Sequence, residues 1–139
     1  MKIIGTGSAH PTCAVTNQML EQFLETTDEW ITERTGIKER CVISSEHLED
    51  MAVHAANKAL EDAGLTAADI DFLICSNVVN EYVTPALSCI IQGKLGAKCP
   101  TVDINAACAG FIYAMDIADD KLKAGKAKNI LIVCAEEPS

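Results

Sequence analysis

The chain has no long hydrophobic run, few basic residues and no closely spaced cysteine pair, and each shortage excludes a class of protein. No apolar run approaches the roughly 20 residues that a membrane-spanning helix needs, so we expect no contact with a membrane. The N-terminus, Met1 to Gly5, lacks the charged and then apolar pattern of an export signal. These two absences predict a cytoplasmic protein.

Basic residues are outnumbered, with 11 lysines and arginines against 20 aspartates and glutamates and a net charge of −9. This net negative charge repels the phosphate backbone of a nucleic acid, so nucleic acid is not an expected partner. Apolar residues make up 49% and charged residues 22%, which excludes intrinsic disorder. A chain of 139 residues is the length of one domain, and it can bury a core without disulfides.

The seven cysteines include no CxxC or CxxxC pair. A zinc site with local ligand spacing is therefore not expected, and we assign no metal ligands. Without an export signal a disulfide framework is not expected either. Most of the thiols are predicted to be small buried hydrophobes, as free cysteines commonly are.

Hydrophobic periodicity predicts strands that alternate with helices. The apolar stretches expected to form strands are 2–5, 71–75, 101–104 and 129–135, and those expected to form helices are a segment from 17, then 26–36, 45–64, 85–95 and 108–124. Alternation of this kind implies right-handed crossovers and a mainly parallel sheet. The runs at 72–75 and 130–134 lack polar alternation, so both of their faces should be covered. The predicted fold class is α/β, with helices on two faces of the sheet.

Several residues have the chemistry of helix ends. Thr16 is placed to cap the helix that starts at Asn17. Thr26 and Glu29 have the spacing of a capping box, which would start the next helix. Gly36 and Gly64 follow apolar helical stretches, where left-handed C-terminal caps are expected.

Cys108 is the candidate nucleophile. It lies where the strand at 101–104 ends and a helix begins, and a helix N-terminus favours thiolate over thiol. The small neighbours in 106–110 leave room for a substrate, and an N–H there could donate to an oxyanion. The alternative is that Cys108 is one more packed thiol. Cys75 and Cys134 fall within predicted strands, and Cys89 is expected on the buried side of a helix.

Two motifs resemble those of a known family. The segment Ala106-Ala107-Cys108-Ala109-Gly110-Phe111 strongly resembles the nucleophile motif of β-ketoacyl-acyl-carrier-protein synthase III, a thiolase-fold condensing enzyme. The segments 27–31, TDEWI, and 34–40, RTGIKER, resemble that family's second signature, and 3–7 looks like its opening strand and turn. The resemblance implies that residues 1–139 are the N-terminal half of the duplicated thiolase-like fold.

The resemblance also implies roles. Cys108 would accept an acyl group from acyl-coenzyme A, and malonyl on acyl carrier protein would decarboxylate and attack that thioester to initiate fatty acid synthesis. Trp30 and Arg34 match positions that hold the adenine of coenzyme A, and Thr26 resembles another residue of that site. Without the resemblance, Trp30 would be a packing anchor and Arg34 a solvated cation. Coenzyme A is a substrate here, and no cofactor is expected.

The resemblance sets two further expectations. Thr84 occupies a position where family members often carry a bulky aromatic residue, at a homodimer contact that closes the acyl pocket, so a homodimer is implied. The family's pattern also needs a histidine and an asparagine from a second half of the chain, which these 139 residues do not supply. We therefore expect the isolated chain to be inactive in condensation.

Three functions stay open at this point: half of a synthase III, half of another thiolase-fold acyltransferase, or a non-catalytic half-domain that binds coenzyme A or a partner. Acylation of Cys108 separates the first two from the third. The product formed with malonyl carrier protein separates the first from the second.

Overall fold

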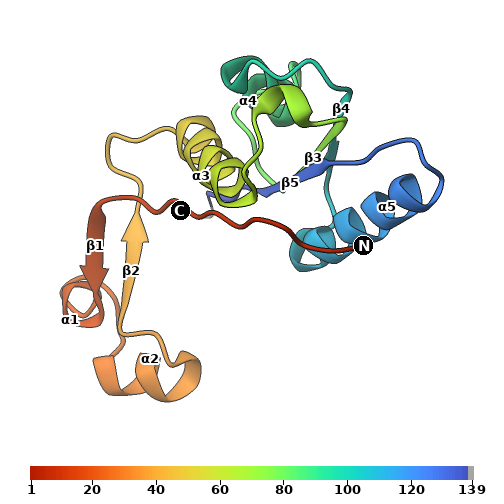
Figure 1. The fold of residues 1–139 in the computed structure, drawn as a ribbon. Coiled ribbons are helices and arrows are strands. Elements are labelled where there is room, and N and C mark those ends of the chain that lie inside the picture. The colour runs from red at the N-terminus through yellow and green to blue at the C-terminus, as the bar shows by residue number, and fades with distance from the viewer. Residues whose placement is uncertain (138–139) are drawn as a thin grey trace. The chain divides into compact units, whose positions relative to one another are not determined.

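A computed structural model describes residues 1–137, which form two compact units. We call residues 10–46 the hairpin unit. The sheet unit consists of residues 1–9 and the residues from His47 onward. Figure 1 shows the elements of both units, which are described separately. The expectation of one N-terminal thiolase-like domain over 1–139 remains a prediction.

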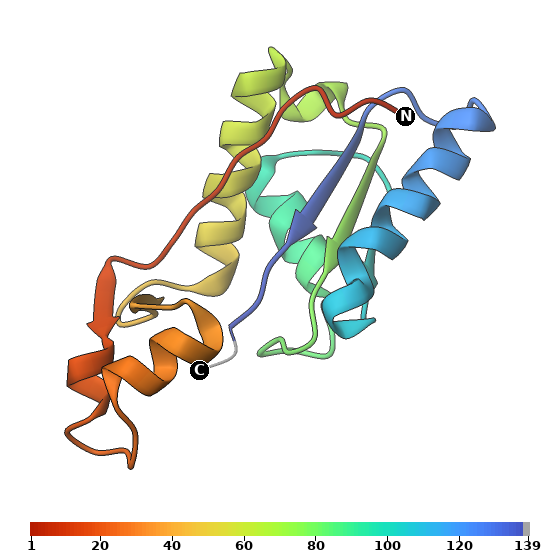
Figure 2. The same cartoon turned by 90° about the horizontal axis from the view of Figure 1, so that it is seen from below.

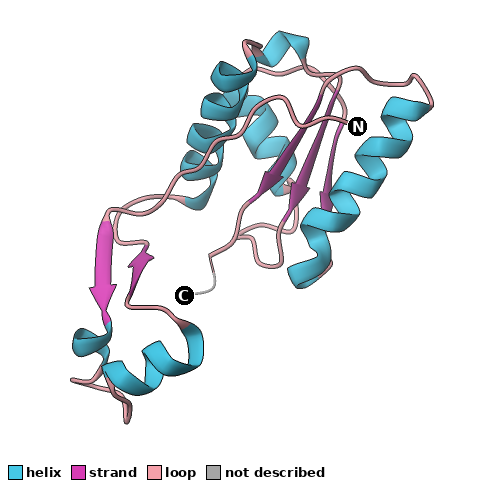
Figure 3. Cartoon of the chain, turned by 60° about the horizontal axis from the view of Figure 1, so that its bottom comes forward, coloured by secondary structure: helices cyan, strands magenta, loops and turns pink. Residues whose placement is uncertain are grey.

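The sheet unit is built on three parallel strands, β3 (Phe72–Ser76), β4 (Thr101–Ile104) and β5 (Ile130–Cys134). Their order is β4-β3-β5, and Leu73 of the central strand pairs with Thr101 on one side and Leu131 on the other. Figure 3 shows the strands running side by side. The three predicted strands and the parallel sheet are confirmed.

Helices cover both faces of this sheet (Figure 2). On one face α3 (Leu48–Ala63) and α4 (Leu87–Leu95) pack on β3 and β5, with Leu73, Leu87 and Ile91 among the buried residues. On the other face α5 (Gly110–Lys123) packs Ala114 and Ala118 on Ile74. Strands that are apolar on both faces are stable only between two such layers. The α/β class predicted from the sequence is therefore confirmed.

The connections between these elements use local capping. Gly64 and Gly96 end α3 and α4 with φ of 66° and 73°, a conformation that costs glycine little. The 3-10 turn η1 (Ala67–Asp69) precedes β3, and the hydroxyl of its N-cap Thr66 donates to the Asp69 carboxylate at 2.7 Å. This hydrogen bond lowers the pKa of Asp69.

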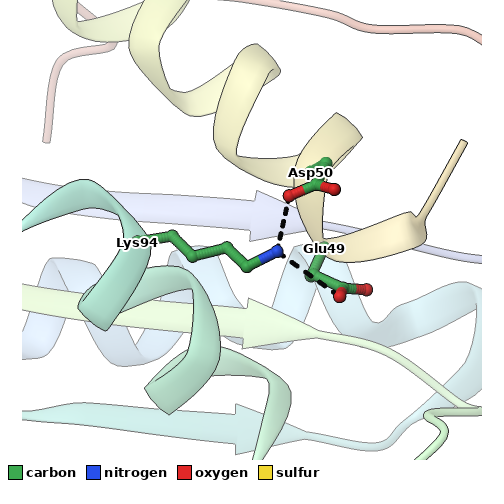
Figure 4. A network of polar contacts seen from close by, with 3 residues as sticks. All are labelled: Glu49, Asp50 and Lys94. Atoms are coloured by element: carbon green, nitrogen blue, oxygen red, sulfur yellow. Dashed lines mark hydrogen bonds and ion pairs between the residues drawn. The ribbon is translucent and has the colours of Figure 1, made fainter.

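Ion pairs also connect helices α3 and α4. Figure 4 shows the ammonium of Lys94 on α4 between Asp50 and Glu49 at the start of α3, at 2.5 and 3.4 Å. The hydrogen bond from Lys94 lowers the pKa of Asp50. All three side chains are partly exposed, so the network adds little beside the apolar contacts of the same two helices.

The predicted strand over residues 2–5 is wrong. Residues 1–9 form no strand, and their polar contacts go to helices. The Met1 ammonium donates to Asp119 on α5 at 3.1 Å, Thr6 N donates to Asp62 on α3 at 2.9 Å, and Lys58 on α3 donates to the carbonyl of Ser8 at 3.0 Å. A Cβ on Gly5 would lie 2.3 Å from the carbonyl oxygen of Ala59, so only glycine permits this approach. Between residues 1–7, α3, α5 and β5 lies a largely apolar cavity of about 540 Å³.

The hairpin unit contains two short antiparallel strands, β1 (Cys13–Thr16) and β2 (Glu39–Val42), which the sequence did not predict. Helix α1 (Asn17–Leu20) follows β1 directly, and Thr16 caps it as predicted by accepting from Met19 N. Helix α2 (Asp28–Thr35) ends at Gly36, also as predicted.

The cap of α2 differs from the prediction by one residue. Thr27 is the N-cap, and its hydroxyl accepts from Trp30 N at 3.1 Å. The predicted capping box of Thr26 and Glu29 is therefore wrong. Thr27 has no glutamate three residues later, so the cap is a single hydrogen bond rather than a reciprocal pair.

Candidate active site

Cys108 lies in a tight turn at the carboxyl end of the sheet. After β4 ends at Ile104, a 3-10 turn, η2 (Ala107–Ala109), leads directly into α5, and the cysteine is exposed at its centre. Ala107 has a φ of 46°, a left-handed backbone conformation that residues other than glycine rarely adopt. The small residue Ala107 allows this sharp turn of the backbone, and the side chain of the next residue, Cys108, is exposed to solvent. The position at a helix N-terminus confirms what the sequence predicted.

Gly110 fixes how closely α5 approaches the sheet. A Cβ at this position would lie 1.9 Å from the hydroxyl oxygen of Ser76, the last residue of β3. Any side chain here would push the helix away from the strand. The glycine of the nucleophile motif therefore allows α5 to begin against β3, and it sets the turn that carries Cys108.

A carboxylate behind this turn joins three segments. Asp103 on β4 accepts hydrogen bonds from the backbone N–H groups of Leu87 and Ser88 at 2.9 and 2.8 Å, and from the Asn77 amide at 3.0 Å. The carboxylate thus caps the start of α4 and holds the strand that leads to Cys108. The sequence argument missed this role. The only available signal was an aspartate inside an otherwise apolar strand.

The other thiols do not share the environment of Cys108. Burial raises the pKa of Cys75 to about 12, with a smaller contribution from Asp103. Desolvation also raises the pKa of Cys99, which is buried, and of Cys134, which is partly desolvated although its residue is exposed. All three therefore remain protonated at neutral pH.

Burial of the cysteines was not predicted correctly. Only Cys75 and Cys99 are buried, whereas Cys89, expected on a buried helix face, is exposed. The buried residues of α4 are Leu87, Ser88 and Ile91, which places Cys89 on the outer side of the helix. Exposure alone therefore does not distinguish Cys108 from the other cysteines. What distinguishes it is its position in the 3-10 turn before α5.

Thr84 lies in the exposed loop that joins β3 to α4 in the sheet unit. The loop carries apolar side chains: Tyr82 is 51% exposed and Val83 is 98% exposed. Exposed apolar groups in one loop are typical of a contact surface. The role of Thr84 beside an acyl pocket stays a prediction.

Trp30 and Arg34 lie one helical turn apart on α2 of the hairpin unit, and both are exposed. The guanidinium carbon of Arg34 lies 5.9 Å from the centroid of the Trp30 ring, within cation–π range. The Thr26 hydroxyl is buried and has no hydrogen-bond partner in the described part of the chain. The structure thus brings Trp30 and Arg34 together and places Thr26 just before the same helix.

Residues 1–137 contain no group of three or more histidine, cysteine, aspartate or glutamate side chains that could hold a metal ion. Among the same residues, no helix is both long and apolar enough to span a bilayer.

The fold and the cysteine turn define a class: the α/β half of a thiolase-fold condensing enzyme. A crystal structure of 3-oxoacyl-[acyl-carrier-protein] synthase III from Aquifex aeolicus superposes with a TM-score of 0.95 at 47% identity, over 98% of this chain and 44% of that one. A priming β-ketosynthase of the R1128 polyketide pathway gives 0.94 at 38% identity, over 98% of this chain and 41% of that one. Xanthomonas campestris OleA gives a TM-score of 0.86 at 30% identity, over 95% of this chain and 42% of that one.

The particular family follows from the sequence comparisons. The family model for 3-oxoacyl-[acyl-carrier-protein] synthase III matches residues 102–139. The β-ketoacyl-[acyl-carrier-protein] synthase III of Clostridium perfringens is 49% identical over 97% of this chain and 42% of its own length. The β-ketoacyl-[acyl-carrier-protein] synthase III of Aquifex aeolicus is 47% identical over 99% of this chain and 45% of its own length. The chain belongs to this family and corresponds to its amino-terminal half, so the predicted resemblance and thiolase-like fold are confirmed.

The chain spans less than half the length of the relatives that it matches, 42% in one case and 45% in another.

Proposed function

We propose that this chain is the nucleophile-bearing half of a β-ketoacyl-acyl-carrier-protein synthase III, an acyltransferase that initiates fatty acid synthesis. The observation that carries the proposal is the turn at Cys108. It combines an exposed thiol, small neighbours and the start of a 14-residue helix in a family whose members bear this name.

The chemistry assigned to Cys108 is transfer of an acyl group. Its thiolate attacks the carbonyl carbon of an acyl-coenzyme A thioester, and the carbon–sulfur bond to coenzyme A breaks as the new thioester forms. The coenzyme A thiolate leaves and takes a proton from water. Partial positive charge at the helix N-terminus favours the attacking thiolate, and backbone N–H groups in the turn can donate to the oxyanion of the tetrahedral intermediate.

Coenzyme A is assigned to the hairpin unit. The indole of Trp30 and the guanidinium of Arg34 offer two flat groups for an adenine, and Thr26 supplies a hydroxyl that has no partner among the described residues. A guanidinium stacks on a base in a way that an ammonium cannot. No cofactor other than the thioester substrate enters this scheme.

The second step needs a partner protein and groups beyond this chain. Malonyl on acyl carrier protein loses carbon dioxide, and the resulting carbanion attacks the Cys108 thioester to give β-ketoacyl carrier protein. The histidine and asparagine that the family uses for this step have no counterpart in these 139 residues. The working form is a cytoplasmic homodimer, and Thr84 lies at the contact that closes the acyl pocket.

A second candidate is another thiolase-fold acyltransferase. It is favoured by the similarity to OleA, whose structures include one with bound lauric acid and lauroyl-CoA at 29% identity. Product analysis decides between the two. The chain is combined with the carboxyl-terminal half of a relative, acyl-coenzyme A and malonyl carrier protein, and the carrier is examined by mass spectrometry. A β-ketoacyl carrier supports the synthase, and a product released without carrier supports the alternative.

A further inference from the structure

Asn17 is the most completely buried polar side chain of the hairpin unit, with none of its surface exposed. It is the first residue of α1, directly after β1, in a unit that has almost no apolar core. Burying an amide without partners is costly, so such a residue is retained only where its hydrogen bonds are satisfied. Its contacts therefore indicate what the unit is built to hold.

The Asn17 amide is saturated by partners from both ends of α2. Its two N–H groups donate to Asp28 Oδ1 at 2.7 Å and to the carbonyl of Ile37 at 2.8 Å. The hydroxyl of Thr32 lies 3.3 Å from the same nitrogen. Asp28 is the first residue of α2, and Ile37 follows the glycine that ends it. One side chain thus fixes both ends of this eight-residue helix.

The oxygen of the same amide is held by the hairpin. Arg40 on β2 donates from one guanidinium nitrogen to Asn17 Oδ1 at 2.7 Å and from the other to the carbonyl of Val15 on β1 at 3.2 Å. The chain Arg40–Asn17–Asp28 therefore connects both strands to α2. A charge-assisted and partly buried network of this kind is more rigid than the helix alone.

Neither Trp30 nor Arg34 has an apolar anchor that could replace this network. Trp30 is 56% exposed, and α2 contains no buried residue. The orientation of Trp30 and Arg34 therefore depends on the position of α2, and that position depends on polar contacts at the two ends of the helix.

We propose that Asn17 is a positioning residue for the Trp30–Arg34 pair. It holds α2 so that the indole and the guanidinium present their faces to one purine base. The inference rests on the proposed binding of coenzyme A at these two residues. Asn17 does not touch the ligand in this account, and its contribution passes through Asp28 and the helix ends.

The test replaces the donor without changing the shape of the side chain. Asn17→Asp keeps the oxygen that faces Arg40 but sets a carboxylate against Asp28 and the Ile37 carbonyl. Coenzyme A is titrated into the 139-residue chain, and fluorescence of Trp30, its single tryptophan, reports binding. We expect the affinity of Asn17→Asp to fall about tenfold, because a buried network loses a hydrogen bond and gains a repulsion. Gln18→Ala is the matched control, since Gln18 is exposed and donates to the other oxygen of Asp28 at 3.1 Å.

A double-mutant cycle separates positioning from loss of stability. If Asn17 acts through the stacking pair, Asn17→Asp has little effect on affinity in an Arg34→Ala background. The reciprocal swap Asn17→Asp with Asp28→Asn restores an amide–carboxylate pair, and it is expected to recover part of the affinity. The swap also serves if the single variant does not fold, which circular dichroism reveals.

The outcomes distinguish the two proposals. Unchanged affinity in a folded Asn17→Asp chain, or an equal loss with and without Arg34, overturns the positioning role and leaves coenzyme A binding intact. No response of the wild-type Trp30 fluorescence to coenzyme A overturns the proposed coenzyme A site, and the positioning role with it.

Discussion

The guanidinium of Arg34 and the indole of Trp30 lie 5.9 Å apart on one exposed face of α2, close enough to act as one binding surface. The family motif predicted that these residues act together, and the helical spacing of four explains how they meet. Their exposure fits a ligand-facing pair better than the packing role that the sequence alone left open.

Replacement of Arg34 by lysine tests stacking directly. Arg34→Lys keeps the charge but loses the planar group, so we expect coenzyme A to bind roughly fivefold to tenfold more weakly, a loss of about 1 kcal/mol. Calorimetric titration of both proteins measures the difference. Equal affinities would indicate a point-charge contact instead.

Cys108 is expected to be the most reactive of the seven thiols. Cys75, with a pKa of about 12, stays protonated at pH 8, and the raised pKa values of Cys99 and Cys134 disfavour their thiolates as well. The exposed Cys41 and Cys89 serve as internal controls, because they lack the turn before α5. Brief iodoacetamide treatment and peptide mapping should find most of the label on Cys108. Faster labelling of Cys41 or Cys89 would contradict the assigned nucleophile.

The sequence predicted β3, β4, β5 and the helices between them well because their signals are local, whereas the strand expected at 2–5 of the same unit is absent. Runs such as 72–75 and 130–134 are apolar on both faces, and Gly64 and Gly96 mark helix ends through a backbone conformation that other residues avoid. The four-residue strands of the hairpin unit have no such pattern. Their pairing depends on partners 25 or so positions away, and it could not be predicted from neighbours in the sequence.

The same limit applies to the polar contacts behind the site. Asp103 caps α4 across 15 and 16 residues, and Asn17 reaches Arg40 across 23. These contacts come from tertiary structure, whereas the role proposed for Cys108 rests on a six-residue motif.

The size of Thr84 predicts the range of primers. If Thr84 lies at the acyl pocket as proposed, its small side chain leaves more volume there than the aromatic residue that the resemblance implies. A complete enzyme containing this chain should then use octanoyl-coenzyme A as well as the acetyl thioester. Initial rates with the two primers measure this, and Thr84→Phe is the control that should restore a preference for acetyl. A strict acetyl preference with Thr84 in place would overturn the prediction.

The isolated chain is expected not to catalyse condensation. The decarboxylation step develops a carbanion, and the family resemblance assigns its stabilisation to a histidine and an asparagine of the second half. Purified chain is incubated with acyl-coenzyme A and malonyl carrier protein, and the carrier is weighed by mass spectrometry. An amount of β-ketoacyl carrier protein above that formed with the Cys108→Ala variant would contradict the prediction that the isolated chain is inactive in condensation.

The most direct test of the account is the mass of the intact chain after incubation with an acyl-coenzyme A. The central claim is that Cys108 accepts the acyl group, so the mass should rise by one acyl unit, and digestion should locate it on the peptide that contains Cys108. Hydroxylamine should remove it, as expected for a thioester, and Cys108→Ala should gain no mass. An unmodified wild-type chain, or the same adduct on Cys108→Ala, would contradict the account.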